Sequence, residues 1–267
     1  MNILPIKKTL NMPRIPRFFL PNIPKYLLKA GLIEVPKNVA HHIYVLRLKQ
    51  GDTVQLFNGC SVIWQGVIVE LSNIYAHIDL QTPVNEDFIM ELPFSITVVQ
   101  SLIEPNKMDW VIEKAVELGV VCCQPIAASR SVTRLNAERA AKRLIHWQAI
   151  AVAASEQCGR SRVMQINTPL SLNMALKQFN ALQINNKIKM THLLLHPEGG
   201  TSLQSWCASQ SPHPIILWVG PEGGWSEAEL LQLESIGSQR ITFGKRVFRT
   251  ETAAVAVSAA VQALWAD

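Results

Sequence analysis

Three glycine-containing loops near the end of the chain are the residues best suited to hold a ligand. They read Leu195-His-Pro-Glu-Gly-Gly, Val219-Gly-Pro-Glu-Gly-Gly-Trp-Ser and Phe243-Gly-Lys-Arg-Val-Phe-Arg-Thr-Glu-Thr-Ala, and each follows an apolar stretch. Glycine has no side chain, so backbone N–H and C=O groups can approach a ligand closely. A need for tight turns would explain one such loop, but three in the last third of the chain favour a shared ligand.

Two common glycine-loop ligand sites do not match these loops. A phosphate-binding loop needs the spacing G-x-x-x-x-G-K-[ST], and none of the three has it. A dinucleotide site needs G-x-G-x-x-G after the first strand and an acid about twenty residues later, which is also absent. The loops therefore indicate some other small ligand.

The elements that position these loops follow from residue 94 onward, where the pattern alternates between strands and helices. Strands are expected at 94–99, 191–195, 214–219 and 241–243, and helices at 108–118, 138–154, 227–233 and 251–265. Ser226, with Glu229 three residues later, is a capping box for the third helix. The alternation predicts an α/β fold with a parallel sheet covered on both faces. Ligands bind beyond the carboxyl ends of such strands, where the three loops begin.

The first third of the chain has a different pattern. Short strands rich in β-branched and aromatic residues are expected at 53–57, 61–69 and 75–80, and the whole of residues 14–85 is interpreted as strands and turns. Strands this short and regular predict a small barrel. The segment 83–93, with Asn85, Glu86 and Asp87, is the expected linker.

The net charge of +5 is unevenly distributed. Residues 1–50 hold nine Lys or Arg and one acid, and residues 130–162 hold seven Lys or Arg against Glu138 and Glu156. This asymmetry favours contact with a polyanion, although charge alone fits ordinary solvated side chains equally well. Apolar residues make up 48%, enough for a large core, and no stretch approaches the roughly 18 apolar residues of a membrane span. Five cysteines without a C-x-x-C pair indicate neither zinc nor a disulfide framework.

The glycine loops also carry a family resemblance. Val219-Gly-Pro-Glu-Gly-Gly and Gly244-Lys-Arg-Val-Phe-Arg-Thr-Glu-Thr-Ala resemble the signature loops of the SPOUT methyltransferases. Further blocks make the likeness narrower: Ile15-Pro-Arg-Phe-Phe, His42-Ile-Tyr-Val-Leu-Arg-Leu-Lys-Gln-Gly-Asp, Leu56-Phe-Asn-Gly, Lys107-Met-Asp, Glu117-Leu-Gly-Val and Ser155-Glu-Gln-Cys-Gly-Arg. With these blocks the chain resembles the RsmE family, the 16S ribosomal RNA methyltransferases that modify ring nitrogen 3 of a uridine.

The resemblance implies a fold and a reaction. It implies a SPOUT-type knotted parallel sheet with helices on both faces, preceded by a small PUA-like β-barrel for RNA. The expected domains are an N-terminal extension (1–11), the PUA-like barrel (12–85) and the SPOUT methyltransferase domain (86–267). It further implies S-adenosylmethionine as cofactor, no metal, a homodimer, and a cytoplasmic enzyme that acts on 16S ribosomal RNA of the small subunit.

The resemblance also assigns residues to roles. The cofactor is expected to contact mainly the backbone of the three loops, at Leu195, His196, Pro197, Glu198, Val219, Gly220, Glu222, Gly223, Gly224, Phe243, Gly244, Arg246, Val247, Phe248 and Thr252. Phe248 stands where the family has a leucine, and it is expected to reshape the adenine pocket. The two basic regions nominate Arg14, Arg17, Arg47, Lys49, Arg130, Arg134 and Arg160 as RNA-binding residues.

The reaction needs a cation and a proton acceptor. Arg249, directly after the cofactor loop, is the best placed cation for the charge that develops on the uracil ring. Glu222 and Glu251 are the candidate carboxylates. Each has a simpler alternative role, in which the acids cap backbone amides and Arg249 forms a salt bridge to one of them.

Two other functions were considered, and motifs of the same sequence argue against each of them. A SPOUT enzyme that methylates ribose 2′-hydroxyls is disfavoured by the Ser155-Glu-Gln-Cys-Gly-Arg block and by the N-terminal barrel. A non-catalytic ribosome-assembly factor that lost the cofactor is disfavoured by the glycines at 220, 223, 224 and 244.

Overall fold

The computed structural model describes residues 15–23, 31–60, 62–84, 91–186 and 190–266, and the chain divides into two compact units between residues 87 and 88. Residues 1–11, the expected extension, lie outside the described residues, as does Arg14. Among the described residues, no helix is both long enough and apolar enough to cross a membrane.

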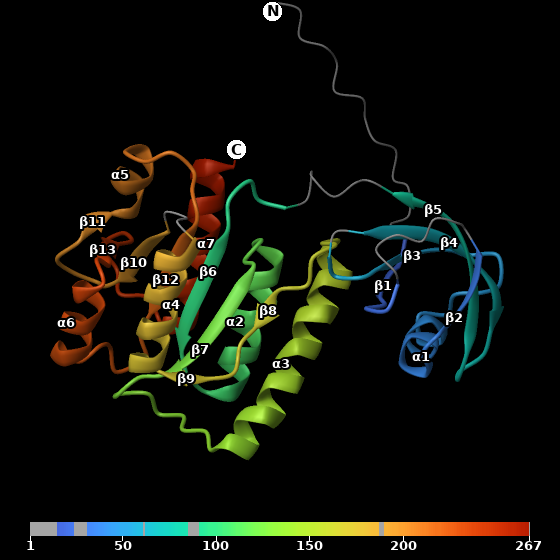
Figure 1. The fold of residues 1–267 in the computed structure, drawn as a ribbon, viewed down its shortest axis with the longest axis horizontal. Helices are drawn as coiled ribbons and strands as arrows, with labels where there is room; N and C mark the ends of the chain where they lie inside the picture. Colours follow the sequence, from blue (N-terminus) through green and yellow to red (C-terminus); the bar gives the residue numbers. More distant parts are fainter. Residues whose placement is uncertain (1–14, 24–30, 61, 85–90, 187–189, 267) are drawn as a thin grey trace, which may run out of the picture. The chain divides into compact units, whose positions relative to one another are not determined.

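The first unit is a five-stranded sheet with one helix packed against it (Figure 1). Its elements are β1 (Arg17–Phe19), β2 (Gly31–Val35), α1 (Lys37–Val45), β3 (Thr53–Phe57), β4 (Ile63–Leu71) and β5 (Ala76–Val84). The strand order is β1-β3-β4-β5-β2, in which β1 and β3 run parallel and the other neighbours run antiparallel. The apolar face of α1 packs into the same core as Phe18, Leu56 and Trp64.

The prediction that residues 14–85 contain only strands and turns is wrong at α1. The segment Ile43-Tyr-Val has strand-forming residue types, which misled the interpretation. The spacing of the buried residues Val39, Ala40 and Ile43 is that of one helical face, and burial of that face against the sheet decides the structure.

The second unit is built on a long parallel sheet. Its elements in order are β6 (Ile96–Ser101), α2 (Pro105–Glu117), β7 (Cys122–Ala127), α3 (Ala137–Cys158), β8 (Gln165–Ile166), β9 (Leu170–Ser171), α4 (Leu172–Asn186), β10 (Thr191–Leu195), β11 (Thr201–Ser202), α5 (Leu203–Ala208), β12 (Ile215–Val219), α6 (Glu227–Ser235), β13 (Gln239–Thr242) and α7 (Thr250–Trp265). The strand order is β11-β13-β10-β12-β6-β7-β8, with β9 also beside β7, and all pairs are parallel.

Helices cover both faces of this sheet, as predicted (Figure 1). In β12, Ile215, Leu217 and Val219 point into a core shared with α2, α3, α5 and α7. Ile216 and Trp218 point to the opposite core, which contains residues of α4 and α6. Because alternate residues of a strand face opposite sides, a strand buried on both faces is apolar throughout.

The strand order brings the three glycine loops together. β13, β10 and β12 are neighbours in the sheet, although β13 is the last strand in the sequence. Each loop begins within a residue or two of the carboxyl end of one of these strands. The capping box expected at the start of α6 is present, with Ser226 and Glu229 exchanging hydrogen bonds.

Candidate active site

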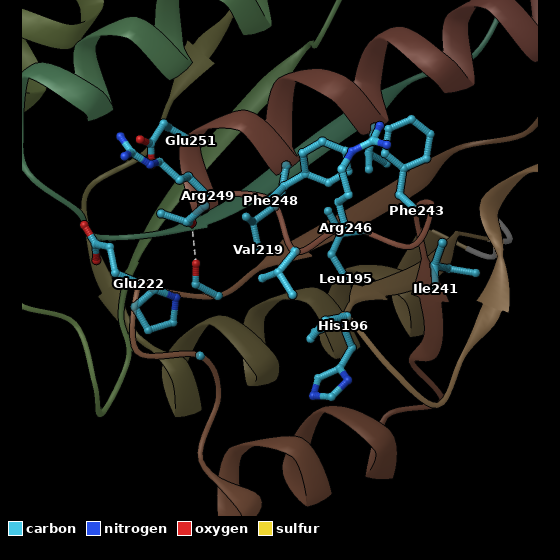
Figure 2. A pocket seen from close by; sticks show the side chains of 18 of the residues that line it. Leu195, His196, Val219, Glu222, Ile241, Phe243, Arg246, Phe248, Arg249 and Glu251 are labelled. Carbon is cyan, nitrogen blue, oxygen red and sulfur yellow. Dashed lines mark hydrogen bonds between the residues drawn. The ribbon is translucent and has the colours of Figure 1, made fainter.

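A pocket of about 510 Å³ lies where the three glycine loops meet (Figure 2). It is lined by Lys107, Leu195, His196, Pro197, Val219, Gly220, Pro221, Glu222, Gly224, Ile241, Phe243, Gly244, Arg246, Val247, Phe248, Arg249, Thr250, Glu251, Ala253 and Val257. The structure thus brings together most of the residues that were assigned to the cofactor and to catalysis. Glu198, Gly223 and Thr252 were assigned too, but they are outside the lining.

The two ends of the pocket differ in polarity. Figure 2 shows Arg249, Glu251 and Glu222 on one side, and Phe243 and Phe248 toward the other. The rings of Phe243 and Phe248 lie 5.6 Å apart and are tilted by 31°, so Phe248 adds an aromatic surface to this end. A ligand with a flat apolar part and a charged part would match this division.

A chain of hydrogen bonds joins three distant segments below the pocket. The buried Gln100 of β6 donates from Nε2 to Thr250 Oγ1 at 3.1 Å. The Thr250 hydroxyl donates to the carbonyl of Gly220. Thr250 is the first residue of α7, so this chain fixes the glycine loop after β12 relative to the start of α7 and to its neighbours Arg249 and Glu251.

Replacing Thr250 by valine should weaken both folding and ligand binding. The change keeps the shape but removes the hydroxyl, leaving the Gly220 carbonyl without this donor. We expect a loss of about 1–3 kcal/mol in the free energy of unfolding, measured by urea denaturation, and a weaker affinity for the ligand. Thr53→Val is the matched control, because Thr53 lies in the first unit and outside the pocket lining, and it should leave both quantities unchanged. Equal effects of the two substitutions would contradict the positioning role of Thr250.

The charged residues of the polar end do not cap the helix that follows them. The side chain of Glu251 is 12% exposed, and its Oε1 lies 3.8 Å from Lys107 Nζ. Its Oε2 is buried and has no hydrogen-bond partner among the described residues. Arg249 is exposed, and in the described part of the chain it forms no salt bridge with either acid. Neither Glu222 nor Glu251 caps a backbone amide there, so the simpler alternatives for these three residues are not observed.

Lys107 is the charged residue of the pocket that the sequence interpretation missed. It belongs to the Lys107-Met-Asp block, which was noted only for the resemblance. Its ammonium group lies between Glu104 at 3.9 Å and Glu251 at 3.8 Å. The other additions to the lining, Pro221, Ile241, Thr250, Ala253 and Val257, are mostly apolar and carry no chemical signal in the sequence.

His196 shapes its loop. Its Nδ1 lies 2.7 Å from the carbonyl oxygen of Glu198 and 3.2 Å from the amide nitrogen of Glu198. The imidazole therefore folds against the backbone of its own loop.

Glu229 connects the second glycine loop to the segment after β7. Its carboxylate accepts hydrogen bonds from the amide and hydroxyl of Ser129, both at 2.7 Å, and from the amide and hydroxyl of Ser226, both at 2.9 Å. Burial alone would raise the pKa of Glu229, but these hydrogen bonds outweigh it and hold the pKa below its usual value. Arg130 strengthens the same junction, donating to the carbonyls of Gly223 at 3.1 Å and Trp225 at 3.3 Å.

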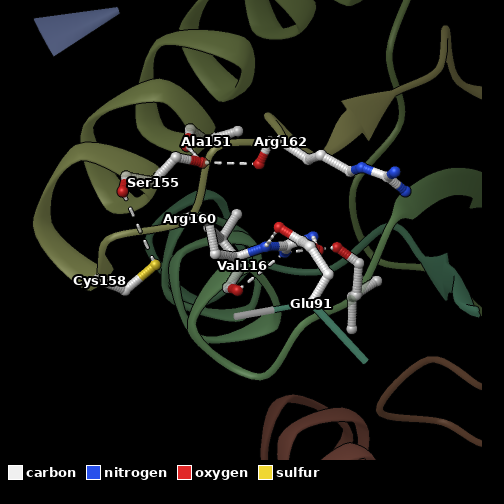
Figure 3. Close-up of polar contacts among 8 residues, drawn as sticks. Glu91, Val116, Ala151, Ser155, Cys158, Arg160 and Arg162 are labelled. Carbon is white, nitrogen blue, oxygen red and sulfur yellow. Dashed lines mark hydrogen bonds and ion pairs between the residues drawn. The ribbon is translucent and has the colours of Figure 1, made fainter. Parts of the chain in front are cut away.

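Two of the arginines nominated for RNA binding are buried. Arg160 is 4% exposed, and its guanidinium donates to both oxygens of Glu91 at 2.7 and 3.1 Å and to the carbonyls of Val116 and Val120 (Figure 3). Arg17 is 9% exposed and lies 5.7 Å from the ring centre of Phe57. Counting charge along the sequence does not reveal burial, so the assignment of Arg160 and Arg17 to an RNA surface is corrected. Arg47, Lys49, Arg130 and Arg134 are exposed.

Known proteins resemble this chain over nearly its full length. The family model of the RNA methyltransferase domain matches residues 90–262, and that of the RNA methyltransferase PUA domain matches residues 35–81. Ribosomal RNA small subunit methyltransferase E of Buchnera aphidicola is 28% identical, covering 95% of this chain and 98% of the relative. The protein of the same name from Neisseria gonorrhoeae, solved with bound S-adenosyl methionine, is 33% identical with a TM-score of 0.82, covering 94% of this chain and 98% of that one.

Proposed function

Because this chain belongs to the ribosomal RNA small subunit methyltransferase E family, we propose that its pocket transfers a methyl group from S-adenosylmethionine to ring nitrogen 3 of a uridine in 16S ribosomal RNA. The observation that carries this proposal is the pocket of three glycine loops, with an aromatic end and a charged end. We propose further that the enzyme acts on ribosomal RNA in the cytoplasm.

The residues of the pocket fit the cofactor. The aromatic end, with Phe243 and Phe248, offers flat apolar surface to an adenine ring. At the other end, the buried Oε2 of Glu251, which has no hydrogen-bond partner in the described part of the chain, provides negative charge for a group that carries a positive one. Backbone groups of the loops at Gly220, Gly224 and Gly244 would hold the polar atoms between these ends.

The chain's own residues supply the remaining chemistry. When bound, S-adenosylmethionine provides an electrophilic methyl group. Ring nitrogen 3 of uracil must release its proton before its lone pair can form the new N–C bond, and Glu251 or Glu222 is the candidate acceptor. Deprotonation leaves negative charge on the uracil oxygens. Arg249, which has no salt bridge with either acid in the described structure, is free to donate to such an oxygen.

The test is mass spectrometry of ribosomal RNA from cells with and without this gene. We expect one N3-methylated uridine of 16S ribosomal RNA to disappear when the gene is deleted and to return with the intact gene. An unchanged nucleoside profile would contradict the proposed function. Loss of a 2′-O-methylated nucleoside instead would support the rival SPOUT specificity.

We further propose that RNA is bound by the exposed basic residues Arg47, Lys49, Arg130 and Arg134. If they neutralise at least about four phosphates, the slope of log affinity against log salt should be −3 or steeper, at about −0.7 per contact. Removing the charges of Arg47 and Lys49 should flatten the slope by about 1.4 and leave cofactor affinity unchanged. A slope that stays the same would place the RNA on another surface.

The enzyme is proposed to act as a homodimer with α7 in the interface. Val257 and Val261 face the core, whereas Ala253, Ala256 and Ala260 are only half-buried and Leu264 is exposed. Contact with a second copy would remove this apolar surface from water. Sedimentation at micromolar concentration should give the mass of two chains, and Ala256→Arg should give that of one. A monomeric mass for the unmodified protein would refute the dimer.

A further inference from the structure

A second pocket of about 490 Å³ lies in the C-terminal unit and is lined in part by the segment that joins β6 to α2. Lys107, near one end of that segment, lines the first pocket, and Leu102, Ile103 and Pro105 line the second. Residues that are close in the sequence, around the start of α2, therefore line both pockets.

The floor of the second pocket is apolar. Leu102, Ile103 and Trp147 are almost fully buried there, and the half-buried Leu135 adds to them. Thr133 closes one side by donating from its hydroxyl to the carbonyl of Ile103 at 2.8 Å. The volume falls within the usual range for small-molecule sites and accommodates a nucleobase.

The rim is basic and comes largely from one helical face. Arg139, Lys142, Arg143 and His146 follow the spacing that places residues on the same side of α3. Lys142 is paired with Glu138 at 2.7 Å, and His146 with Asp109 at 2.8 Å. No hydrogen bond or salt bridge of the guanidinium groups of Arg139 and Arg143 is present among the described residues. An apolar floor under free guanidinium groups matches a base with its phosphate.

We propose that the second pocket binds a nucleotide of the RNA substrate next to the methylated uridine, with the base on the apolar floor and its phosphate on Arg139 and Arg143. This inference rests on the proposed function. The charge of the rim favours a nucleic acid strand over a second copy of the chain, as does the closeness in sequence of residues 102–107, which line the two pockets. Binding here would fix which uridine reaches the methyl donor.

The experiment uses full-length protein and small ribosomal subunits from cells that lack the gene. Arg139→Ala and Arg143→Ala should each raise KM for the subunits about tenfold and flatten the salt slope of kcat/KM by about 0.7. Both variants should keep kcat and the affinity for S-adenosylmethionine. Lys177→Ala is the charge-matched control, because Lys177 is an exposed residue of α4 on the opposite face of the sheet, and it should change nothing.

Ultraviolet cross-linking followed by mass spectrometry locates the RNA directly. Cross-links from peptides containing residues 102–105 or 133–147 should map to nucleotides adjacent to the methylated uridine. The inference is overturned if the unmodified enzyme is active and both arginine variants have the same KM as that enzyme. It is also overturned if the unmodified protein is a dimer and either variant is a monomer, because the pocket would then bind a second copy of the chain. The unmodified protein is assayed first. If it methylates no subunits, the proposed function itself is overturned, and the variants are not needed to show this.

Discussion

Arg249→Ala should lose methyl transfer by about a hundredfold or more in single-turnover rate while keeping S-adenosylmethionine affinity within a few fold. Arg249 precedes α7, lines the charged end of the pocket, and has no salt bridge with either neighbouring acid in the described structure. Its guanidinium can therefore oppose the charge that grows on uracil as nitrogen 3 loses its proton. Removing one such donor typically costs on the order of a hundredfold in turnover.

Two further variants separate this role from a general effect of charge. Arg249→Lys should recover little activity, because an ammonium group lacks the planar fork of a guanidinium. Lys245→Ala removes an exposed cation of the same loop that does not line the pocket, and it should leave the rate near normal. Near-normal single-turnover rates in Arg249→Ala, with folding intact, would make Arg249 a structural residue.

Gly220→Val should lose roughly ten- to a hundredfold in affinity for S-adenosylmethionine, measured by calorimetry. A Cβ atom at Gly220 would lie 3.0 Å from Nε1 and 3.2 Å from Cε2 of the buried Trp225. The larger valine must push the loop away from that ring. Overpacking of this kind costs about 1–3 kcal/mol of stability, and the displaced loop no longer offers its backbone to the cofactor in the same geometry. The reason for glycine here is thus the packing of Trp225, in addition to any close approach of a ligand.

Gly237→Val provides the control for Gly220→Val. Gly237 has a positive φ of 81°, so valine strains the backbone there, but a Cβ atom would meet nothing within 4 Å and the residue is outside the pocket lining. We expect a lower melting temperature without a change in cofactor affinity. If Gly220→Val binds S-adenosylmethionine as tightly as the unmodified protein, the loop does not form the cofactor site.

Local sequence patterns predicted the elements that carry the site. The strand at 191–195 and the capping box of Ser226 and Glu229 were predicted from a few neighbouring residues, and both are confirmed. The SPOUT-type fold with its PUA-like first domain came from the resemblance and is confirmed by the relatives. The loops after three strands were recognisable because glycine is dense there.

Contacts between distant residues could not be predicted in this way. Gln100 and Thr250 are 150 positions apart, and Arg160 is 69 positions from Glu91. Nothing in the local sequence marks these pairs, so the hydrogen-bond chain under the pocket was missed and Arg160 was assigned to a surface. Helix α1 was missed for a related reason, because its residue types favour a strand and only packing against the sheet selects the helix.

The insertion of β13 between β11 and β10 has a consequence for how the protein is made. A chain emerging from the ribosome has β10, β11 and β12 before it has β13 and α7, which supply one loop and one wall of the pocket. Contacts between β10 and β13 are non-local in the sequence. Such contacts form slowly, because the entropy of closing the intervening loop is lost before the contact stabilises the chain. A nascent chain that ends before residue 239 therefore lacks the part of the pocket between Ile241 and Val257, and we expect methyl-donor binding to begin only after these residues have been made.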